Sequence, residues 1–311
     1  MKKASPSGRI VIIGAGNVGS AIAFSLINKD IAQKIIMLDT NTSLLNSQIL
    51  DLQDSTNFSD SVEIYSGDYA DLIDGDMVVL ACGVSQKREQ SRSELLKENL
   101  VTVRSVISNI RHTGKQVYIC VVTNPVDPLT YFAIKEANLP QGMVFGSGTL
   151  LDTSRLKICL RDMLDISHKN IHAYIMGEHG DSSFAVLSSA DVGGIPMNML
   201  MDIENVRDEI QSNVRDKAYE IIDGKGATYY GIGSAVAELC SYIINDEKRI
   251  ATLSYLLEGQ YGIYDVVLSA PVKVSSNGVE ALQELEMNSV EIELMKESAK
   301  RIKEEISNNT K

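Results

Sequence analysis

The stretch RIVIIGAGNVGSAIAF, residues 9–24, decides the fold of this chain. Its aliphatic start predicts a buried strand, and the apolar-rich segment 17–30 predicts a helix directly after that strand. The same alternation continues through the first half of the chain. Further strands are predicted at 34–39, 76–82, 116–124 and 143–148, and further helices at 43–55 and 93–111. Val and Ile runs that alternate with helices are typical of a parallel sheet covered on both faces, so we predict a doubly wound α/β domain with right-handed crossovers.

The turn between the first strand and helix is GAGNVG, which matches the pattern GxGxxG. Gly14 permits the tight turn, Gly16 lets the backbone approach a pyrophosphate, and Gly19 allows close packing of the helix on the strand. The helix N-terminus, where Asn17 and Val18 lie, supplies free N–H donors and positive partial charge for phosphates. The position of the motif therefore predicts a Rossmann-type dinucleotide site.

The second predicted strand ends at Asp39. A carboxylate there can accept hydrogen bonds from ribose hydroxyls and would repel a 2′-phosphate, so NAD is favoured over NADP. Two alternatives stay open at this point. One is a turn aspartate beside packing glycines, and the other is an S-adenosylmethionine enzyme, which also uses a glycine loop and an acidic strand end.

The second half of the chain is less regular and predicts an α+β domain. Helices are predicted at 152–164, 203–223, 227–246 and 289–307, and strands at 170–177 and around an NG turn at Asn277-Gly278. A chain of 311 residues suits two domains better than one compact core. We expect a nucleotide-binding domain over 1–146 and a substrate-binding, catalytic domain over 147–311.

Composition excludes several classes of partner. The net charge of −12 argues against nucleic acid, because neutralising phosphates needs a concentrated basic surface. The first apolar run is short and broken by glycines, so we expect neither a signal peptide nor a membrane span. The four cysteines are scattered and form no CxxC pair, which predicts buried free thiols in a reducing cytoplasm and no metal site.

Two motifs of the second half carry chemistry. GEHGD follows an apolar strand and contains His179, the only histidine that lies between glycine-rich turns. LDTSR places Asp152 and Arg155 three positions apart, so both project from one side of a helix start. Asp152 can hold an imidazole in one tautomer, and Arg155 can make a planar two-bond fork with a substrate carboxylate. The alternatives are a structural histidine and a helix cap followed by a surface arginine.

Two motifs of the first half carry further polar candidates. In TNPVD a strand stops at Asn124, which can orient a hydroxyl or an amide, although an NP pair also makes a plain turn. SQKREQSR follows an apolar strand and ends at Arg92. Its charges suit either a solvated loop or a polar flap that closes over a site.

These motifs resemble those of the L-lactate/L-malate dehydrogenases. GAGNVG, SQKREQSR, TNPVD, GSGTLLDTSR, GEHGDSS and KGATYYGIG occur in the order and spacing of that family, and the resemblance covers essentially the whole chain. It implies an NAD-dependent enzyme that reduces a 2-keto acid such as pyruvate to the L-2-hydroxy acid. It also implies a cytoplasmic location and a homotetramer.

The resemblance assigns roles by position. His179 resembles the proton donor to the keto oxygen, Asp152 its carboxylate partner, and Arg155 the anchor of the substrate carboxylate. Arg92 resembles the loop arginine that polarises the carbonyl, and Asn124 a residue near the reacting oxygen. The implied cofactor-binding set is Gly14, Gly16, Asn17, Val18, Gly19, Asp39, Gly83, Asn99, Thr123, Asn124 and Ser147, the last beside the nicotinamide carboxamide.

One loop position separates malate from lactate enzymes in this family, and it falls on Gln86. Malate enzymes carry an arginine there, and a glutamine would leave the second carboxylate of oxaloacetate unpaired and desolvated. Gln86, together with Thr228 in KGATYYG, therefore favours pyruvate. Lactate enzymes usually place glycine just beyond this position, whereas Lys87-Arg88-Glu89 follows here. A malate dehydrogenase, or a 2-hydroxy acid dehydrogenase of wider range, is the alternative enzyme.

A catalytically silent NAD-binding protein is the alternative of another class, but it would need none of the polar residues assigned to chemistry. Bacterial lactate enzymes often bind fructose 1,6-bisphosphate through an arginine and a histidine, whose positions here hold Lys157 and His172. A lysine lacks the two-bond fork, so we expect weak or absent activation.

Overall fold

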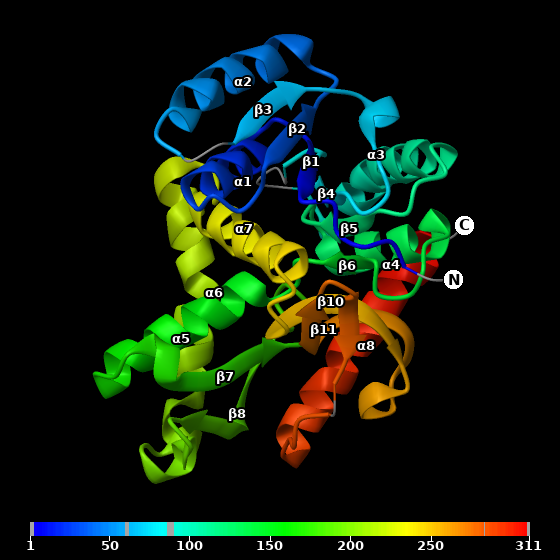
Figure 1. The fold of residues 1–311 in the computed structure, drawn as a ribbon. Helices are drawn as coiled ribbons and strands as arrows, with labels where there is room; N and C mark the ends of the chain where they lie inside the picture. The colour runs from blue at the N-terminus through cyan, green and yellow to red at the C-terminus, as the bar shows by residue number, and fades with distance from the viewer. Residues whose placement is uncertain (1–2, 60–61, 86–89, 283, 310–311) are drawn as a thin grey trace. The chain divides into compact units, whose positions relative to one another are not determined.

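The computed structural model describes residues 3–59, 62–85, 90–282 and 284–309. The chain divides into two compact units (Figure 1). Unit 1 comprises Met1–Ser147, Tyr229–Ile250 and Lys273–Glu280, and unit 2 comprises Gly148–Thr228, Ala251–Val272 and Ala281–Lys311. Each unit is built around buried aliphatic side chains.

Unit 1 contains a parallel sheet with the strand order β3-β2-β1-β4-β5-β6. Its strands are β1 (Arg9–Ile13), β2 (Lys34–Leu38), β3 (Glu63–Ser66), β4 (Met77–Leu80), β5 (Tyr118–Val121) and β6 (Val144–Gly146). Because β1 pairs with β2 on one side and β4 on the other, the strand order reverses beside β1. Ligands of doubly wound sheets bind outside the carboxyl ends of the strands at such a switch point.

The helices of unit 1 are α1 (Asn17–Asn28), α2 (Thr42–Thr56), α3 (Arg92–His112), α4 (Val126–Ala137) and α7 (Tyr230–Ile244). A capping box starts α3, since Ser91 and Glu94 each accept from the other's backbone N–H. The sequence therefore predicted the doubly wound sheet and the helices at 43–55 and 93–111 correctly. It missed β3, a strand in which Ile64 alone is buried, so no apolar run marks it.

Helix α7 lies within the second half of the sequence, yet it belongs to unit 1 and packs on α1. A Cβ atom at Gly233 would lie 2.8 Å from the carbonyl oxygen of Ala21, so only glycine allows the two helices to approach this closely. The apolar composition of α7 fits a helix buried between neighbours.

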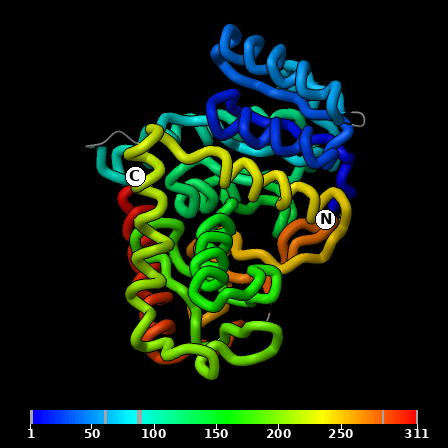
Figure 2. Tube along the Cα trace, turned by 90° about the vertical axis from the view of Figure 1, so that its left-hand side faces the viewer, coloured from blue at the N-terminus to red at the C-terminus, as the bar shows by residue number. Residues whose placement is uncertain are grey.

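Unit 2 combines a small antiparallel sheet with long helices. The sheet has the order β7-β8-β9, with Tyr174 opposite Val186. Its strands are β7 (Ile171–Met176), β8 (Phe184–Val192) and β9 (Ile195–Pro196), and α5 (Leu150–Leu164) and α6 (Ile203–Lys225) cover it. Figure 2 shows α5 and α6 side by side. Leu156, Leu160, Ile171, Ile175, Leu187 and Ile210 form the centre of this core.

The remaining elements are β10 (Arg249–Glu258), β11 (Tyr264–Ser275), β12 (Gly278–Ala281) and α8 (Ser289–Asn309). The predicted turn at Asn277-Gly278 is confirmed, because it joins β11 to β12. The sequence did not predict β10, since a short apolar segment of mixed pattern does not distinguish strand from helix. The predicted amphipathic helix at 289–307 is confirmed as α8, whose buried side includes Met295, Ile302 and Ile306.

The start of α8 is fastened by the buried carboxylate of Glu291. It accepts the backbone N–H groups of Leu187 at 3.0 Å and Ser188 at 3.1 Å, and Arg207 lies 3.4 Å away. These bonds and the ion pair compensate for the burial of a charge. Across the described part of the chain, no helix is long and apolar enough to cross a membrane.

Candidate active site

The glycine loop of unit 1 has the geometry that a dinucleotide needs. Gly14 has a φ of +112°, and a Cβ there would lie 2.5 Å from the carbonyl oxygen of Ala81. A Cβ at Gly19 would lie 1.8 Å from the carbonyl oxygen of Gly14, so the helix packs directly on the turn. A Cβ at Gly16 would meet nothing within 4 Å. The space beside Gly16 is therefore open where a pyrophosphate would approach the backbone.

The start of α1 is available to an anion. Gly16 is the N-cap residue, and no side chain caps the helix. The first backbone N–H groups, at Asn17 and Val18, have no partner within the helix by its geometry, and they carry the positive end of the helix dipole. This arrangement suits the phosphates of a dinucleotide.

Asp39 lies at the carboxyl end of β2 and hydrogen-bonds the backbone of the glycine loop. One carboxylate oxygen accepts from the backbone N–H of Ala15 at 2.7 Å, and the other accepts from Asn41 at 2.8 Å. A carboxylate has about four lone-pair sites, so two remain for ribose hydroxyls. Asp39 thus holds the phosphate loop in place while keeping acceptors for the sugar.

Asn99 is a buried residue whose side-chain amide hydrogen-bonds the protein backbone. Its oxygen accepts from Val84 N–H at 2.8 Å, and its nitrogen donates to the carbonyls of Val84 at 3.1 Å and Asn124 at 2.7 Å. Thr123, which is also buried, donates to the carbonyl of Cys82 at 2.6 Å. Asn99 and Thr123 therefore align the backbone that leaves β4 and β5, whereas the side chain of Asn124 is exposed.

Gly83 leaves no room for a side chain in this cluster. It has a φ of +140°, and a Cβ would lie 2.6 Å from the amide oxygen of Asn99. The Asn124-Pro125 peptide bond is cis. Ser147, the last residue of the first segment of unit 1, is buried, and its N–H donates to the carbonyl of Val121 at 2.8 Å.

In unit 2 the structure brings together the three residues predicted for chemistry. His179 Nδ1 lies 2.7 Å from Asp152 Oδ2, and Arg155 Nη1 donates to Asp152 Oδ1 at 2.9 Å. The side chain of Asp152 is 11% exposed and that of His179 28% exposed. Asp152 thus bridges an imidazole and a guanidinium.

The burial and charges around Asp152 set its ionisation. Burial alone raises the pKa of a carboxyl, but the positive charge and hydrogen bond of His179, with those of Arg155, outweigh it. The net result is that the pKa of Asp152 lies below its usual value. Asp152 is therefore an anion at neutral pH and can stabilise a positively charged His179.

Two buried threonines explain why Asp152 faces His179. Thr149 Oγ1 donates to the carbonyl of Ile175 at 2.6 Å, and Thr153 Oγ1 accepts from the N–H of Ile175 at 2.9 Å. The first turn of α5 is thereby attached to the middle of β7. Since β7 leads into His179, the attachment fixes helix and histidine in one register. No sequence motif marks these threonines as functional, although they flank Asp152 in TLLDTSR.

The remaining residues predicted for the site belong to other elements of the chain. Arg92 is half-buried and is the first residue of α3 in unit 1, and Thr228 lies between α6 and α7. Gln86 and the Lys87-Arg88-Glu89 segment fall outside the described residues. No group of three or more His, Cys, Asp or Glu side chains that could hold a metal ion occurs in the described segments.

Lys157 and His172 lie on neighbouring elements of unit 2. The Lys157 ammonium is 5.8 Å from the centroid of the Tyr174 ring, and Tyr174 shares one side of β7 with His172. His172 Nδ1 lies 3.1 Å from Asp191 Oδ1. An acidic side chain therefore lies beside His172, one of the two residues that the resemblance connects with a sugar phosphate.

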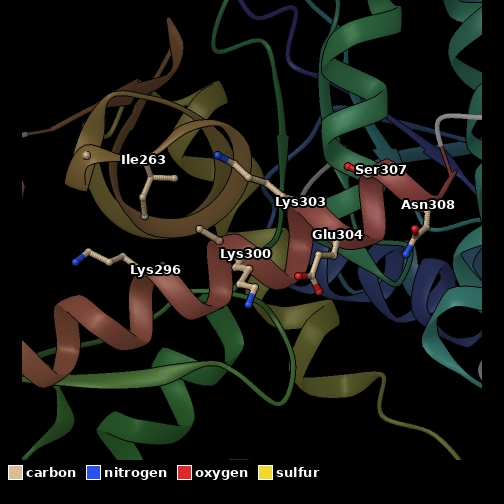
Figure 3. A pocket seen from close by; sticks show the side chains of 9 residues that line it. Ile263, Lys296, Lys300, Lys303, Glu304, Ser307 and Asn308 are labelled. Carbon is tan, nitrogen blue, oxygen red and sulfur yellow. The ribbon is translucent and has the colours of Figure 1, made fainter.

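A groove of about 560 Å³ runs along α8 (Figure 3). It is lined by Gly262, Ile263, Lys296, Ala299, Lys300, Lys303, Glu304, Ser307 and Asn308. None of these belongs to the predicted site. The candidate active site is therefore the hydrogen-bonded cluster of His179, Asp152 and Arg155, and not this groove.

Comparison with known proteins decides the family. Residues 8–146 match the NAD binding domain of lactate/malate dehydrogenase, and residues 149–311 match the alpha/beta C-terminal domain of the same family. The chain belongs to the lactate/malate dehydrogenase family. NAD is therefore the cofactor, and the open backbone at Gly16 and the acceptors of Asp39 fit it. The S-adenosylmethionine alternative is excluded.

Relatives in this family match nearly the whole chain. The L-lactate dehydrogenase of Acetivibrio thermocellus is 39% identical over 302 residues, and that of Geobacillus thermodenitrificans is 40% identical over 301, each covering 95% of both chains. The solved structure of the minor L-lactate dehydrogenase from Enterococcus mundtii has a TM-score of 0.92 and 34% identity. That match covers 96% of this chain and 98% of the other. The predicted family and fold class are confirmed.

Proposed function

We propose that this chain is an NAD-dependent L-lactate dehydrogenase, which reversibly reduces pyruvate to (S)-lactate. The relatives that match 95% of this chain are named L-lactate dehydrogenase, which supports this activity. The observation that carries it is the Arg155–Asp152–His179 cluster, in which a buried carboxylate joins a cationic anchor to an imidazole. Such a set is suited to an acid substrate whose neighbouring oxygen must gain or lose a proton.

Each residue of the cluster has a separate task. Arg155 binds the carboxylate of pyruvate and so fixes the direction of the keto group. His179 donates a proton to the keto oxygen, and Asp152 holds the ring and stabilises its cation. Arg92 stabilises the negative charge that develops on that oxygen. Bound NADH supplies the hydride to the keto carbon.

Asn124 of unit 1 is assigned to the reacting oxygen by its position in TNPVD. Its exposed side chain can hydrogen-bond the reacting oxygen while its own carbonyl is held by Asn99.

Substrate choice rests on the sequence of the loop. The neutral Gln86 and the small polar Thr228 favour pyruvate over a dicarboxylate. Lys87 and Arg88 follow Gln86 in the sequence and add two cations, which favours a second candidate, a malate or wider 2-hydroxy acid dehydrogenase.

Assembly and regulation follow the family. We propose a cytoplasmic homotetramer with weak or absent activation by fructose 1,6-bisphosphate. Lys157 cannot form the two-bond fork of an arginine, and Asp191 beside His172 opposes a phosphate by its negative charge.

The deciding experiment is a panel of keto acids. We expect kcat/KM with NADH to be at least tenfold higher for pyruvate than for oxaloacetate or 2-ketoisocaproate. A preference for oxaloacetate would overturn the assignment, and a preference for 2-ketoisocaproate would support the wider enzyme. The same assays with fructose 1,6-bisphosphate should change the pyruvate KM less than threefold, and light scattering should give the mass of four chains.

A further inference from the structure

A second buried carboxylate lies directly beside His179. The side chain of Glu178 is 2% exposed. Ser182 Oγ donates to Glu178 Oε2 at 2.5 Å, and Arg301 Nη1 on α8 lies 3.5 Å from the same oxygen. A buried carboxylate needs such partners, because an unpaired charge in the interior is costly. None of the roles assigned above uses this group.

The bond between Glu178 and Ser182 closes a loop with His179 inside it. Two backbone bonds tighten the same loop, from Gly180 N–H to the carbonyl of Glu178 at 3.0 Å and from Ser183 N–H to that of Gly180 at 3.1 Å. The imidazole is therefore carried by a short loop whose two ends are joined by a side chain.

The loop is also attached to α8. Ser298, which is fully buried, donates to the carbonyl of Ser182 at 2.7 Å, and its oxygen lies 3.0 Å from Ser182 Oγ. Gly177 has a φ of +89°, and a Cβ there would lie 2.6 Å from Ser298 Oγ. Gly177 exchanges two backbone hydrogen bonds with Ser269. The segment that carries His179 is thus held on both sides.

We propose that Glu178 is a positioning residue, whose carboxylate joins Ser182 and Arg301 so that the loop holds His179 against Asp152. The inference rests on the proposed function, because it names a residue that acts on the proton donor of that reaction. Glu178 acts through the loop and not on the substrate. Loss of its bond to Ser182 lets the loop open and loosens the His179–Asp152 contact.

Kinetics of four variants test the proposal. Glu178→Gln removes the charge, Ser182→Ala removes the donor, and Ser182→Thr keeps a hydroxyl. Glu293→Gln is the matched control, because it makes the same chemical change on the exposed face of α8. We expect the first two to lower kcat for pyruvate by about 10-fold to 100-fold, since small misplacements of a catalytic group cost this much.

Three further readouts separate positioning from a general structural defect. The falling limb of the pH profile of kcat/KM should move to lower pH in Glu178→Gln and Ser182→Ala, because the proton donor loses part of its contact with an anion. The NADH affinity should stay within twofold, since the glycine loop lies in unit 1. Ser182→Thr should recover kcat to within threefold of the wild type.

A measurement without substrate keeps the two proposals apart. In enzyme labelled with ¹⁵N-histidine, the ring shifts of His179, assigned with His179→Gln, report which nitrogen carries the proton. We expect the Nδ1–H form to dominate in the wild type and Glu293→Gln, and to fall in Glu178→Gln and Ser182→Ala. An inactive wild type would refute the proposed function, while these shifts would still decide the role of Glu178.

Unchanged kcat, pH profile and ring shifts in Ser182→Ala would overturn the proposal. Should Glu178→Gln fail to fold, Ser182→Ala and Ser182→Thr carry the comparison, because both keep the Glu178–Arg301 pair.

Discussion

Replacement of Asp152 by asparagine removes one charge from the site with almost no change of shape. Asp152 accepts from His179 at 2.7 Å and from Arg155 at 2.9 Å, and its side chain is 11% exposed. An amide offers one acceptor and one donor group, so its nitrogen must face one of these two donors. The variant therefore loses an ion pair and gains an unfavourable contact.

The size of the effect follows from Coulomb's law. Two opposite unit charges about 4 Å apart interact by about 4 kcal/mol at an effective dielectric of about 20. Because His179 is partly exposed, solvent screens some of this energy, and we take about 3 kcal/mol as the loss. This loss should move the falling limb of the pH profile of kcat/KM down by roughly two pH units. At neutral pH it should lower kcat/KM by about 100-fold.

Stopped-flow reduction of pyruvate by NADH between pH 5 and 9 measures both quantities in wild type and Asp152→Asn. We expect the falling limb of the kcat/KM profile to move to lower pH, with NADH affinity unchanged. A variant with kcat/KM within threefold of the wild type and the same pH profile would refute the bridging role of Asp152.

The same variant has an expected effect on acid stability. Because the folded pKa of Asp152 lies below the unfolded value of about 3.9, its contribution to stability is complete above that pH. It is lost as the pH falls through the folded pKa. Urea unfolding should therefore depend less steeply on pH in Asp152→Asn than in the wild type below about pH 4.

Three other changes test the two binding sites. Arg155→Lys should raise the pyruvate KM by about 10-fold to 100-fold, because a lysine cannot form the two-bond fork with a carboxylate. The control Arg161→Lys, on the exposed side of α5, should leave the KM unchanged. Equal KM values for the two variants would contradict the role of Arg155 as the substrate anchor. Asp39→Ser should shift the kcat/KM ratio of NADPH to NADH upward at least tenfold, and an unchanged ratio would remove Asp39 from cofactor choice. Gly16→Ala should fold normally, but titration should show NADH binding weakened at least tenfold. Gly19→Ala should instead lower the Tm by several degrees, because its Cβ would meet a carbonyl oxygen. The reverse result would contradict the roles given to the two glycines.

Local sequence was sufficient for the nucleotide unit. The glycine loop, the end of β2 at Asp39 and the capped start of α3 depend on residues close together in the chain, so their spacing predicts their geometry. The apolar runs of β1, β2, β4 and β5 likewise identify the sheet, since strands buried on both faces need continuous apolar sequence. Strand β3 was not predicted, because an edge strand does not need a continuous apolar sequence.

Only the tertiary structure decided how the catalytic groups meet. Asp152 and His179 are 27 positions apart, and their contact depends on two threonine hydroxyls that attach α5 to β7. Ser298 reaches the loop of His179 across 116 positions, and α7 joins the first unit because Gly233 admits the backbone of α1. The sequence determined which residue types and local turns are present. Packing of elements distant in the chain determined which buried charges and hydroxyls face one another, because a side chain must find its partner where the interior excludes water.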